Sequence, residues 1–248
     1  MIVKRLTQAL QRQDWAVVSI EFVLVVVGVL LAFQINEYAN RREAANEREG
    51  ATERLLVEAE ESVAYMRQTV DFQQGLVDDL NFALIRVQSG QGRPEDQKRM
   101  LAGLSRARTA TPLAPPSSVY DDLVASGTFG QIGDPALRSK IAKYRSSLLY
   151  SAQVREKLTR DMPRLEEHPA LHYVFTPEGR HRIRLKVDFP ALRKDSLLQE
   201  KLAMLADDQR VLLVNRRRIL KDLQLMCVAL GQFVGRDCNM DLPLPTYE

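Results

Sequence analysis

The sequence predicts an all-α protein, in which an N-terminal transmembrane helix continues into a long helix and is followed by an antiparallel helical bundle with one irregular or extended segment at about 168–190. Three observations support this fold class. A run of twenty residues near the N-terminus contains a single ionisable side chain. Helical periodicity then continues from residue 36 to residue 87 without a proline. Only 6% of the 248 residues are aromatic, whereas the helix-forming residues Ala, Leu, Arg, Glu and Gln recur.

The apolar run covers residues 16–35, AVVSIEFVLVVVGVLLAFQI. At about 1.5 Å of rise per residue, a helix of this length spans ~30 Å, the thickness of the hydrocarbon core of a bilayer. Trp15 and Tyr38 flank the run, as aromatic residues do at lipid–water boundaries. A cleaved signal peptide would need a small-x-small cleavage site, which the run lacks, and a helix that is apolar on every face would be hard to bury in a soluble domain. We interpret residues 15–38 as an uncleaved single-pass transmembrane helix, preceded by a short basic leader at 1–14.

Glu21 is the one ionisable residue of this run and lies about 7–8 Å below its N-terminal boundary. Gly28 and Ala32 share its helical stripe and form a small-xxx-small pair, which allows two helices to approach closely. The stripe predicts a contact in the lipid bilayer with a second copy of the chain (a homo-oligomer) or with a partner membrane protein, in which Glu21 is hydrogen-bonded. The alternative is that Glu21 extends to the nearer headgroups with help from Arg12.

The remaining chain is predicted to form one domain with a stalk and a tail. Residues 39–54 are mostly charged and small and predict a helical stalk, with a flexible linker as the alternative. Residues 55–236 form the helical bundle, and 237–248 form a Pro-rich tail. The first part of the bundle has apolar residues at nearly coiled-coil spacing, namely Leu55, Ala59, Val63, Met66, Val70, Leu76, Leu80, Leu84 and Val87.

Capping residues and prolines divide the rest of the bundle into elements. Helices are predicted at about 94–108, from a cap at Ser117 or Ser118 to Gly127, from Asp134 to Pro163, and over 196–232 after a cap at Asp195. The prolines of 111–116 make that stretch an extended connector. Residues 182–189 alternate as a strand does, but no convincing partner strand is seen, so we expect this segment to lie unpaired on the bundle.

The last predicted helix carries two polar residues, Gln209 and Arg216, on the same stripe as its inward apolar residues, which are Leu198, Leu202, Leu205, Leu212, Ile219, Leu223 and Cys227. A buried Arg216 would need an acidic partner, for which the candidates are Asp121, Asp122 and Asp161. Guanidinium groups bind carboxylates and phosphates, so the candidate anion-binding residues are Arg182, Arg184 and Arg216. The alternative is a solvated basic surface balanced by nearby acids.

The two cysteines bear on the orientation in the membrane, because basic residues are nearly balanced on the two sides of the span. A disulfide between Cys227 and Cys238 would fold the tail onto the last helix and would persist in an oxidising compartment. Two unrelated buried thiols are the alternative. The disulfide favours a C-terminal domain outside the cytoplasm.

No catalytic motif, glycine-rich phosphate loop or zinc-ligand spacing occurs. His168 and His172 are four residues apart, but Pro169 interrupts the helix that such a metal pair would need. We therefore expect no enzymatic activity, no cofactor and no metal site. The net charge of +3 is too small to indicate binding to nucleic acid.

Two stretches together resemble a bacterial family of unknown function. The first is Ile20–Asn36, IEFVLVVVGVLLAFQIN, which is similar to the span of that family, with Tyr38 where a tryptophan is usual. The second runs from YDDLVASG at 120–127 to QIGDPALRSKI at 131–141, with Phe129 where leucine is usual. The resemblance implies a single-pass bacterial membrane protein with a helical extramembrane domain. Together with the cysteines, it leads us to expect the bacterial inner (cytoplasmic) membrane, with the C-terminal domain outside the cytoplasm. The resemblance implies no activity.

Two functional hypotheses follow. The leading one is a membrane-anchored helical scaffold or interaction protein that assembles through its transmembrane helix and presents its bundle to a partner. The alternative is a sensor-like domain that binds an anionic ligand near Arg216 and signals through a partner membrane protein. A solid core around Arg216 would favour the first, whereas a polar cavity at Arg216 would favour the second.

Overall fold

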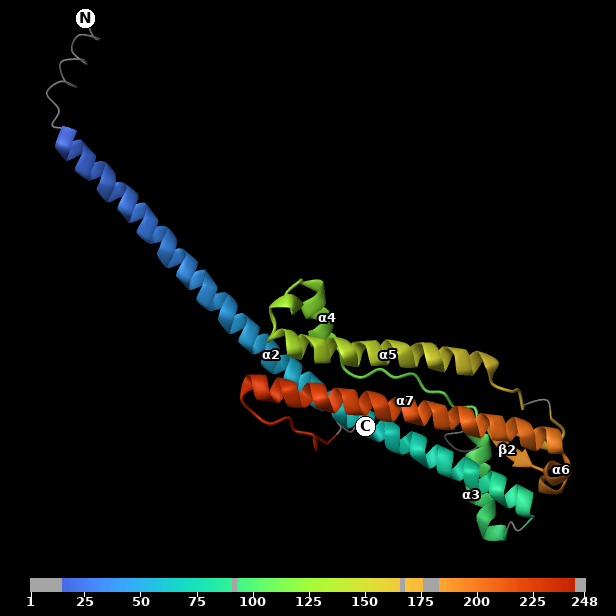
Figure 1. The fold of residues 1–248 in the computed structure, drawn as a ribbon. Helices are drawn as coiled ribbons and strands as arrows, with labels where there is room; N and C mark the ends of the chain where they lie inside the picture. The colour runs from blue at the N-terminus through green and yellow to red at the C-terminus, as the bar shows by residue number, and fades with distance from the viewer. Residues whose placement is uncertain (1–14, 91–92, 166–167, 176–182, 244–248) are drawn as a thin grey trace, which may run out of the picture. The chain divides into compact units, whose positions relative to one another are not determined.

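The computed structural model describes residues 15–90, 93–165, 168–175 and 183–243, and it confirms the all-α class (Figure 1). The long helices are α2 (Trp15–Ser89), α5 (Pro135–Asp161) and α7 (Ser196–Val234). The short ones are η1 (Pro94–Asp96), α3 (Gln97–Ser105), α4 (Ser118–Ala125), η2 (Phe129–Gln131) and α6 (Phe189–Lys194). Two strands, β1 (Leu171–Phe175) and β2 (Ile183–Val187), complete the described fold.

The chain divides into two units, Met1–Ala51 and Thr52–Glu248. In the first unit, α2 carries the apolar run, and its described apolar side chains are exposed, from Ile20 at 61% to Ile35 at 68%. Within the described residues, α2 is the one helix long and apolar enough to cross a membrane. None of its most apolar window is buried, which is contrary to the arrangement of an interior helix in a soluble protein.

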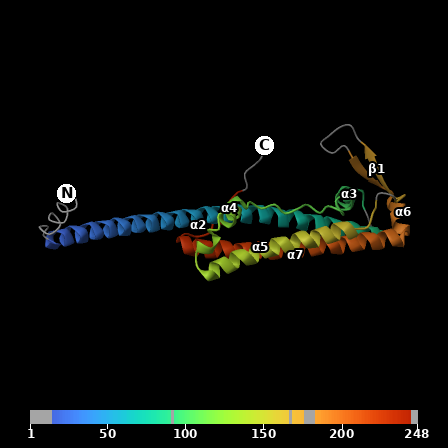
Figure 2. The same ribbon diagram turned by 90° about the horizontal axis from the view of Figure 1, so that it is seen from above.

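The second unit is a bundle of α2 from Thr52 onward, α5 and α7. The colours of Figure 1 show that α7 runs antiparallel to α2 and α5, and α5 and α7 lie side by side in Figures 1 and 2. All nine apolar positions predicted for the first part of the bundle are buried, as are the seven predicted for α7. Gln209 and Arg216 are also buried on the α7 stripe, at 0% and 1% exposure. The helical periodicity therefore identified the inward faces of both helices.

The caps predicted for α5 and α7 are confirmed. The carboxylate of Asp134 accepts a hydrogen bond from the Leu137 N–H at 2.7 Å, and that of Asp195 accepts one from the Leu198 N–H at 2.9 Å. Ser117 occupies the N-cap position predicted for α4, but its side chain accepts no hydrogen bond from the helix. Glu58 of α2 accepts hydrogen bonds from the Val119 N–H at 2.6 Å and the Tyr120 N–H at 3.2 Å. A carboxylate from a neighbouring helix satisfies these N–H groups and also suits the positive end of the α4 dipole.

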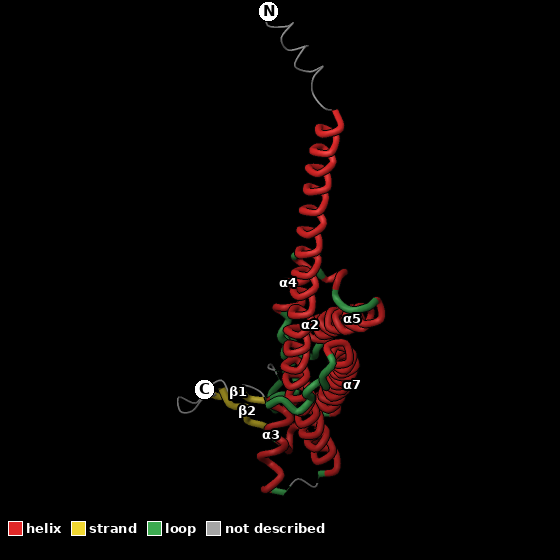
Figure 3. The backbone as a smooth tube through the Cα atoms, turned by 90° about the vertical axis from the view of Figure 1, so that its left-hand side faces the viewer, coloured by secondary structure: helices red, strands yellow, loops and turns green. Residues whose placement is uncertain are grey.

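The expected unpaired extended segment is instead the second strand of a hairpin (Figure 3). β1 and β2 pair antiparallel, with Leu171 opposite Val187 and Phe175 opposite Ile183. Leu171 and Leu185 are buried against α3 and α7 in the main core cluster, which anchors the base of the hairpin. The prediction failed because residues 171–175 lack the strict polar–apolar alternation of 182–189, although Tyr173, Val174 and Phe175 all favour strands.

Gly103 of α3 lies directly against the backbone of α2, where an added Cβ would overlap the Asp79 carbonyl. We expect Gly103→Ala to lower the free energy of unfolding by about 1–3 kcal/mol, because two packed helix backbones must separate. Gly75→Ala is the matched control, since a Cβ there meets no atom within 4 Å, and removing a helix-interior glycine should stabilise by about 0.5–1 kcal/mol. Urea unfolding of both variants tests this, and equal effects of the two substitutions would contradict the close approach.

Candidate functional site

Residues 106–117, here called the connector, join α3 to α4 and run along the bundle between them (Figure 1). Such an irregular segment satisfies few of its own carbonyl groups, so the others need donors from neighbouring elements. Gln209 donates from Nε2 to the Ala107 carbonyl at 2.8 Å and to the Thr109 carbonyl at 3.1 Å. Its Oε1 in turn accepts a hydrogen bond from Nε2 of Gln73 at 2.7 Å. The buried glutamine on the α7 stripe thus binds the connector backbone.

Arg216 lies two turns further along α7 and also binds the connector. Its Nη2 donates to the Thr111 carbonyl at 2.9 Å and to Thr111 Oγ1 at 3.0 Å. Its Nη1 is buried and has no hydrogen-bond partner among the described residues. Burial lowers the pKa of this guanidinium, and the nearby Tyr65 opposes that shift only in part. Arg216 is therefore a buried cation whose hydrogen-bonding capacity is incompletely used.

The predicted acidic partner of Arg216 was wrong. The three candidates Asp121, Asp122 and Asp161 are all exposed, and within the described chain Arg216 forms no ion pair. Asp121 instead accepts a hydrogen bond from Arg145 of α5 at 3.1 Å. The prediction considered only carboxylates as partners. The guanidinium of Arg216 instead donates hydrogen bonds to two uncharged oxygens of the connector, the carbonyl and the hydroxyl of Thr111.

A cavity of about 250 Å³ lies between the connector, α5 and α7, and Arg216 lines it. The connector contributes Thr111, Pro112, Leu113, Ala114, Pro115 and Ser117; α5 contributes Arg145, Leu148, Leu149, Ser151, Ala152 and Arg155; α7 contributes Leu212 and Arg216. The cavity therefore lies entirely within the Thr52–Glu248 unit.

The lining of the cavity carries positive charge only. It includes three guanidinium groups, from Arg145, Arg155 and Arg216, and none of its described residues is Asp or Glu. Arg145 is partly engaged elsewhere, because it pairs with Asp121 and its guanidinium lies 4.3 Å from the centroid of the Tyr120 ring. The half-buried Arg155 side chain has no hydrogen bond or ion pair with another described residue. Three cations around a small hollow make a site suited to an anion.

Sequence reasoning identified Arg216 but missed Arg145 and Arg155. A signal for them exists, because Arg145, Leu148, Ala152 and Arg155 follow at intervals of three, four and three residues, which places them on one face of α5. From the sequence alone, this face of α5 resembles the exposed face of an ordinary amphipathic helix, because the position of the connector against it is not known.

The other predicted site residues do not join this cavity. Arg184 is exposed on β2 and does not line it, and Arg182 lies outside the described residues. Glu21, Gly28 and Ala32 lie exposed on α2 in the Met1–Ala51 unit, where a Cβ added at Gly28 would meet no atom within 4 Å. Within the described parts of the chain, no group of three His, Cys, Asp or Glu side chains is placed to hold a metal ion.

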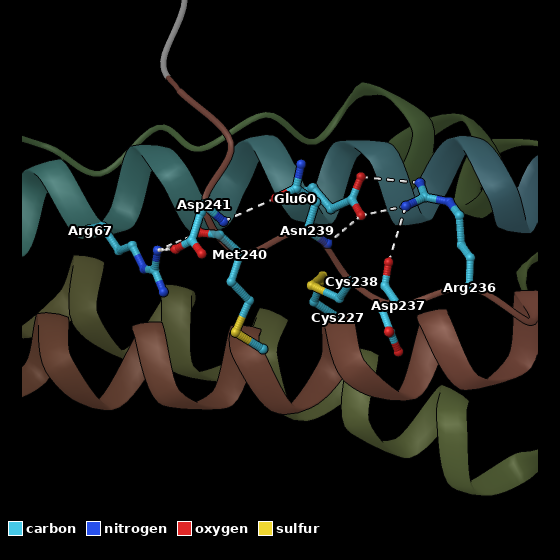
Figure 4. Close-up of a disulfide and its surroundings, with 9 residues drawn as sticks. All are labelled: Glu60, Arg67, Cys227, Arg236, Asp237, Cys238, Asn239, Met240 and Asp241. Carbon is cyan, nitrogen blue, oxygen red and sulfur yellow. Dashed lines mark hydrogen bonds and ion pairs between the residues drawn. A yellow bond between two sulfur atoms is a disulfide. The ribbon is translucent and has the colours of Figure 1, made fainter.

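Cys227 and Cys238 form a disulfide, with Cα atoms 5.7 Å apart, that folds the tail back along α7 (Figure 4). The tail then reaches α2 through Glu60, which accepts hydrogen bonds from Arg236 at 2.6 Å and from the Asn239 N–H at 2.7 Å. Asp241 receives a further hydrogen bond from Arg67 at 2.7 Å. Residues 236–241, here called the tail clamp, thus connect the end of α7 to α2.

The tail clamp makes stability depend on pH through Glu60. Burial raises the pKa of this carboxyl, but the hydrogen bonds from Arg236 and the Asn239 N–H outweigh burial and lower it below its ordinary value of 4.5. A lowered folded-state pKa adds stability above the unfolded-state pKa, and this contribution is lost as the pH falls through the folded-state value. We expect Glu60→Gln to reduce the loss of stability seen in wild type on acidification below about pH 5, measured by urea unfolding across pH.

Glu61→Gln is the matched control for this experiment, because Glu61 is the exposed neighbour of Glu60 on the same helix. Its pH profile should follow that of wild type. Identical profiles for Glu60→Gln and wild type would contradict the assigned role of the carboxylate.

No protein-family model, curated protein or solved structure matches the chain.

Proposed function

We propose that the protein is a single-pass membrane protein whose Thr52–Glu248 unit binds a small anion at Arg216 and communicates its occupancy to a partner membrane protein. One observation carries the proposal: a buried guanidinium with an unpartnered Nη1 lines a cavity that has two further arginines and no described carboxylate. A cavity lined by Arg216 favours ligand binding, whereas a solid core around Arg216 would have favoured the scaffold hypothesis.

The energetics of Arg216 support a ligand. A buried unpaired N–H of a charged group costs more than the roughly 1–3 kcal/mol typical of a neutral unsatisfied group. A buried cation without a counter-ion adds a desolvation penalty of several kcal/mol. A bound anion would offset both, because it supplies an acceptor and a counter-charge at the same place. The two Thr111 oxygens that bind Arg216 are neutral, so they accept hydrogen bonds but provide no counter-charge.

The connector is the route by which occupancy would reach other parts of the unit. It lines the cavity from Thr111 to Pro115 and then leads directly into α4, whose first N–H groups bind Glu58 of α2. The connector is also held to α2 by Tyr65, whose hydroxyl accepts a hydrogen bond from the Ala114 N–H at 3.1 Å. A ligand that moves this segment would therefore act on α2 through contacts that already exist.

The membrane part of the proposal rests on the apolar helix and its small-residue stripe. We place the chain in the bacterial inner membrane with the Thr52–Glu248 unit outside the cytoplasm, because a disulfide persists in an oxidising compartment. Glu21, Gly28 and Ala32 would form the contact with a second copy or a partner membrane protein.

Cysteine placed at Gly28 or Ala32 should give an oxidative crosslink in membranes, and the same substitution at Val29 should not. Equal crosslinking at all three positions would refute the assigned face of the helix.

Ligand binding is tested with the full chain in zwitterionic nanodiscs. Thermal unfolding is measured in acetate, hexanoate or phosphate at constant ionic strength, with chloride as reference. At least one of these anions should raise the midpoint, since a ligand that binds the folded state stabilises it. Ala152→Phe should abolish the effect by filling the cavity at an exposed position of α5.

Ala142→Phe is the matched control, because Ala142 is also an exposed alanine of α5 but does not line the cavity. It should behave as wild type. The proposal fails if no anion raises the midpoint, or if the midpoint rises equally in Ala152→Phe.

A further inference from the structure

We infer that the anion is an organic one, with a single carboxylate or phosphate monoester head and an apolar body, rather than an inorganic oxyanion. This inference rests on the proposed function and specifies the ligand of that same cavity. It follows from three properties of the lining: where the unpartnered polar groups lie, what the rest of the wall is made of, and how large the space is.

Two buried polar side chains of the lining have unused hydrogen-bonding capacity. Nη1 of Arg216 is one, in a residue that is 1% exposed. The other is Ser151 of α5, which is 5% exposed and whose side chain makes no hydrogen bond within the described chain. A guanidinium edge and a hydroxyl together provide the donors that one carboxylate or phosphate head accepts. Arg155, half-buried and without a partner among the described residues, adds charge but is less deeply placed.

Most of the remaining wall is apolar. Leu148 and Leu149 come from α5, Leu212 from α7, and Pro112, Leu113 and Pro115 from the connector. Leu149 is 68% exposed although it borders this hollow, so a large apolar side chain at the site lacks a packing partner. An inorganic oxyanion would leave these surfaces in contact with water, whereas an apolar ligand body would cover them.

The volume supports the same conclusion. A cavity of about 150 Å³ accommodates benzene, which has six carbons. The present cavity, at about 250 Å³, has room on that scale for a ligand of roughly ten non-hydrogen atoms. A bare phosphate or sulfate has five. The space therefore fits a head together with a short aliphatic or aromatic body.

The experiment is a chain-length series by isothermal titration calorimetry on the full chain in zwitterionic nanodiscs. The probes are acetate, butyrate, hexanoate, hexyl phosphate, inorganic phosphate and hexanol. Each methylene that enters an apolar site contributes up to about fourfold in affinity, so hexanoate should bind at least tenfold more tightly than acetate. Hexyl phosphate should likewise exceed inorganic phosphate, and hexanol should bind weakly because it lacks the charge.

Two variants separate the contributions of body and head. Ala152→Phe should abolish binding of hexanoate while Ala142→Phe retains it. Arg155 is half-buried, and its side chain contacts no other described residue through a hydrogen bond or ion pair. Arg155→Gln should therefore weaken the binding of hexanoate by several-fold and leave the binding of hexanol unchanged. Comparing hexanoate with hexyl phosphate identifies which head the arginines prefer.

The outcomes separate this inference from the proposed function. Affinity that rises with chain length and depends on position 152 supports both. Equal binding of acetate, hexanoate and inorganic phosphate, all lost in Ala152→Phe, overturns the organic ligand and leaves an inorganic-anion site. Absence of binding by every probe, or binding unchanged by Ala152→Phe, overturns the site itself. Hexanol binding as tightly as hexanoate overturns the role of the anionic head.

Discussion

Replacement of Arg216 by methionine is expected to raise the free energy of unfolding of the unliganded protein by about 1–3 kcal/mol, while weakening anion binding by roughly 10- to 100-fold. The stabilisation follows because Arg216 is a buried cation without a carboxylate partner in the described chain, and methionine has a similar length and is easily buried. The lost hydrogen bonds to Thr111 offset part of this gain. Urea unfolding and calorimetry measure the two effects on the same sample.

Opposite signs of these two effects distinguish a ligand-binding arginine from a structural one. If the main role of Arg216 were to hold the connector at Thr111, its loss would destabilise the protein, because the Thr111 carbonyl would lose its donor and the connector would lose an attachment to α7. Arg218→Met, at an exposed position of the same helix, is the control and should change stability by less than about 0.5 kcal/mol. A variant Arg216→Met that unfolds more easily than wild type by over 1 kcal/mol would refute the interpretation.

Periodicity predicted which side chains of the long helices are buried, and it did so even for polar ones. Gln209 and Arg216 were placed on the inward stripe of α7 because a helix repeats at a fixed interval, whatever the residue type. Their partners could not be predicted from the same pattern. The connector has no periodicity, and its hydrogen bonds join residues about a hundred positions apart, such as Arg216 and Thr111. The cavity forms because the connector packs against α7, so it could not be predicted from the sequence.

The errors at α4 and at the hairpin have a common physical origin. In both, the sequence was interpreted locally and the partner came from a distant segment. Glu58, sixty-one residues before Val119, takes the place of the local serine cap. β1 pairs with β2, and the base of this hairpin is held by Leu171 and Leu185 in the core. Local strand propensity contains no information about that packing. The apolar run of α2 was predictable because its signal lies entirely in its own composition.

Replacement of Cys238 by serine should lower the free energy of unfolding by about 3 kcal/mol, the chain-entropy contribution of a bridge that closes a loop of this size. The tail clamp should loosen as well, because Arg236 and Asn239 then bind Glu60 without the covalent constraint. Trypsin should therefore cleave after Arg236 faster in the variant than in wild type, before the bundle unfolds. Urea unfolding and timed proteolysis measure the two effects.

Reduction of the wild-type protein is the control for Cys238→Ser, and both should give the same stability as the double variant Cys227→Ser/Cys238→Ser, because one bond is lost in every case.

A disulfide that forms in the cell also tests the orientation in the membrane. In intact cells treated with an alkylating reagent before lysis, the two thiols should be protected if the Thr52–Glu248 unit is outside the cytoplasm. Complete alkylation would place this unit in a reducing compartment, and the bridge would then contribute nothing to the native protein.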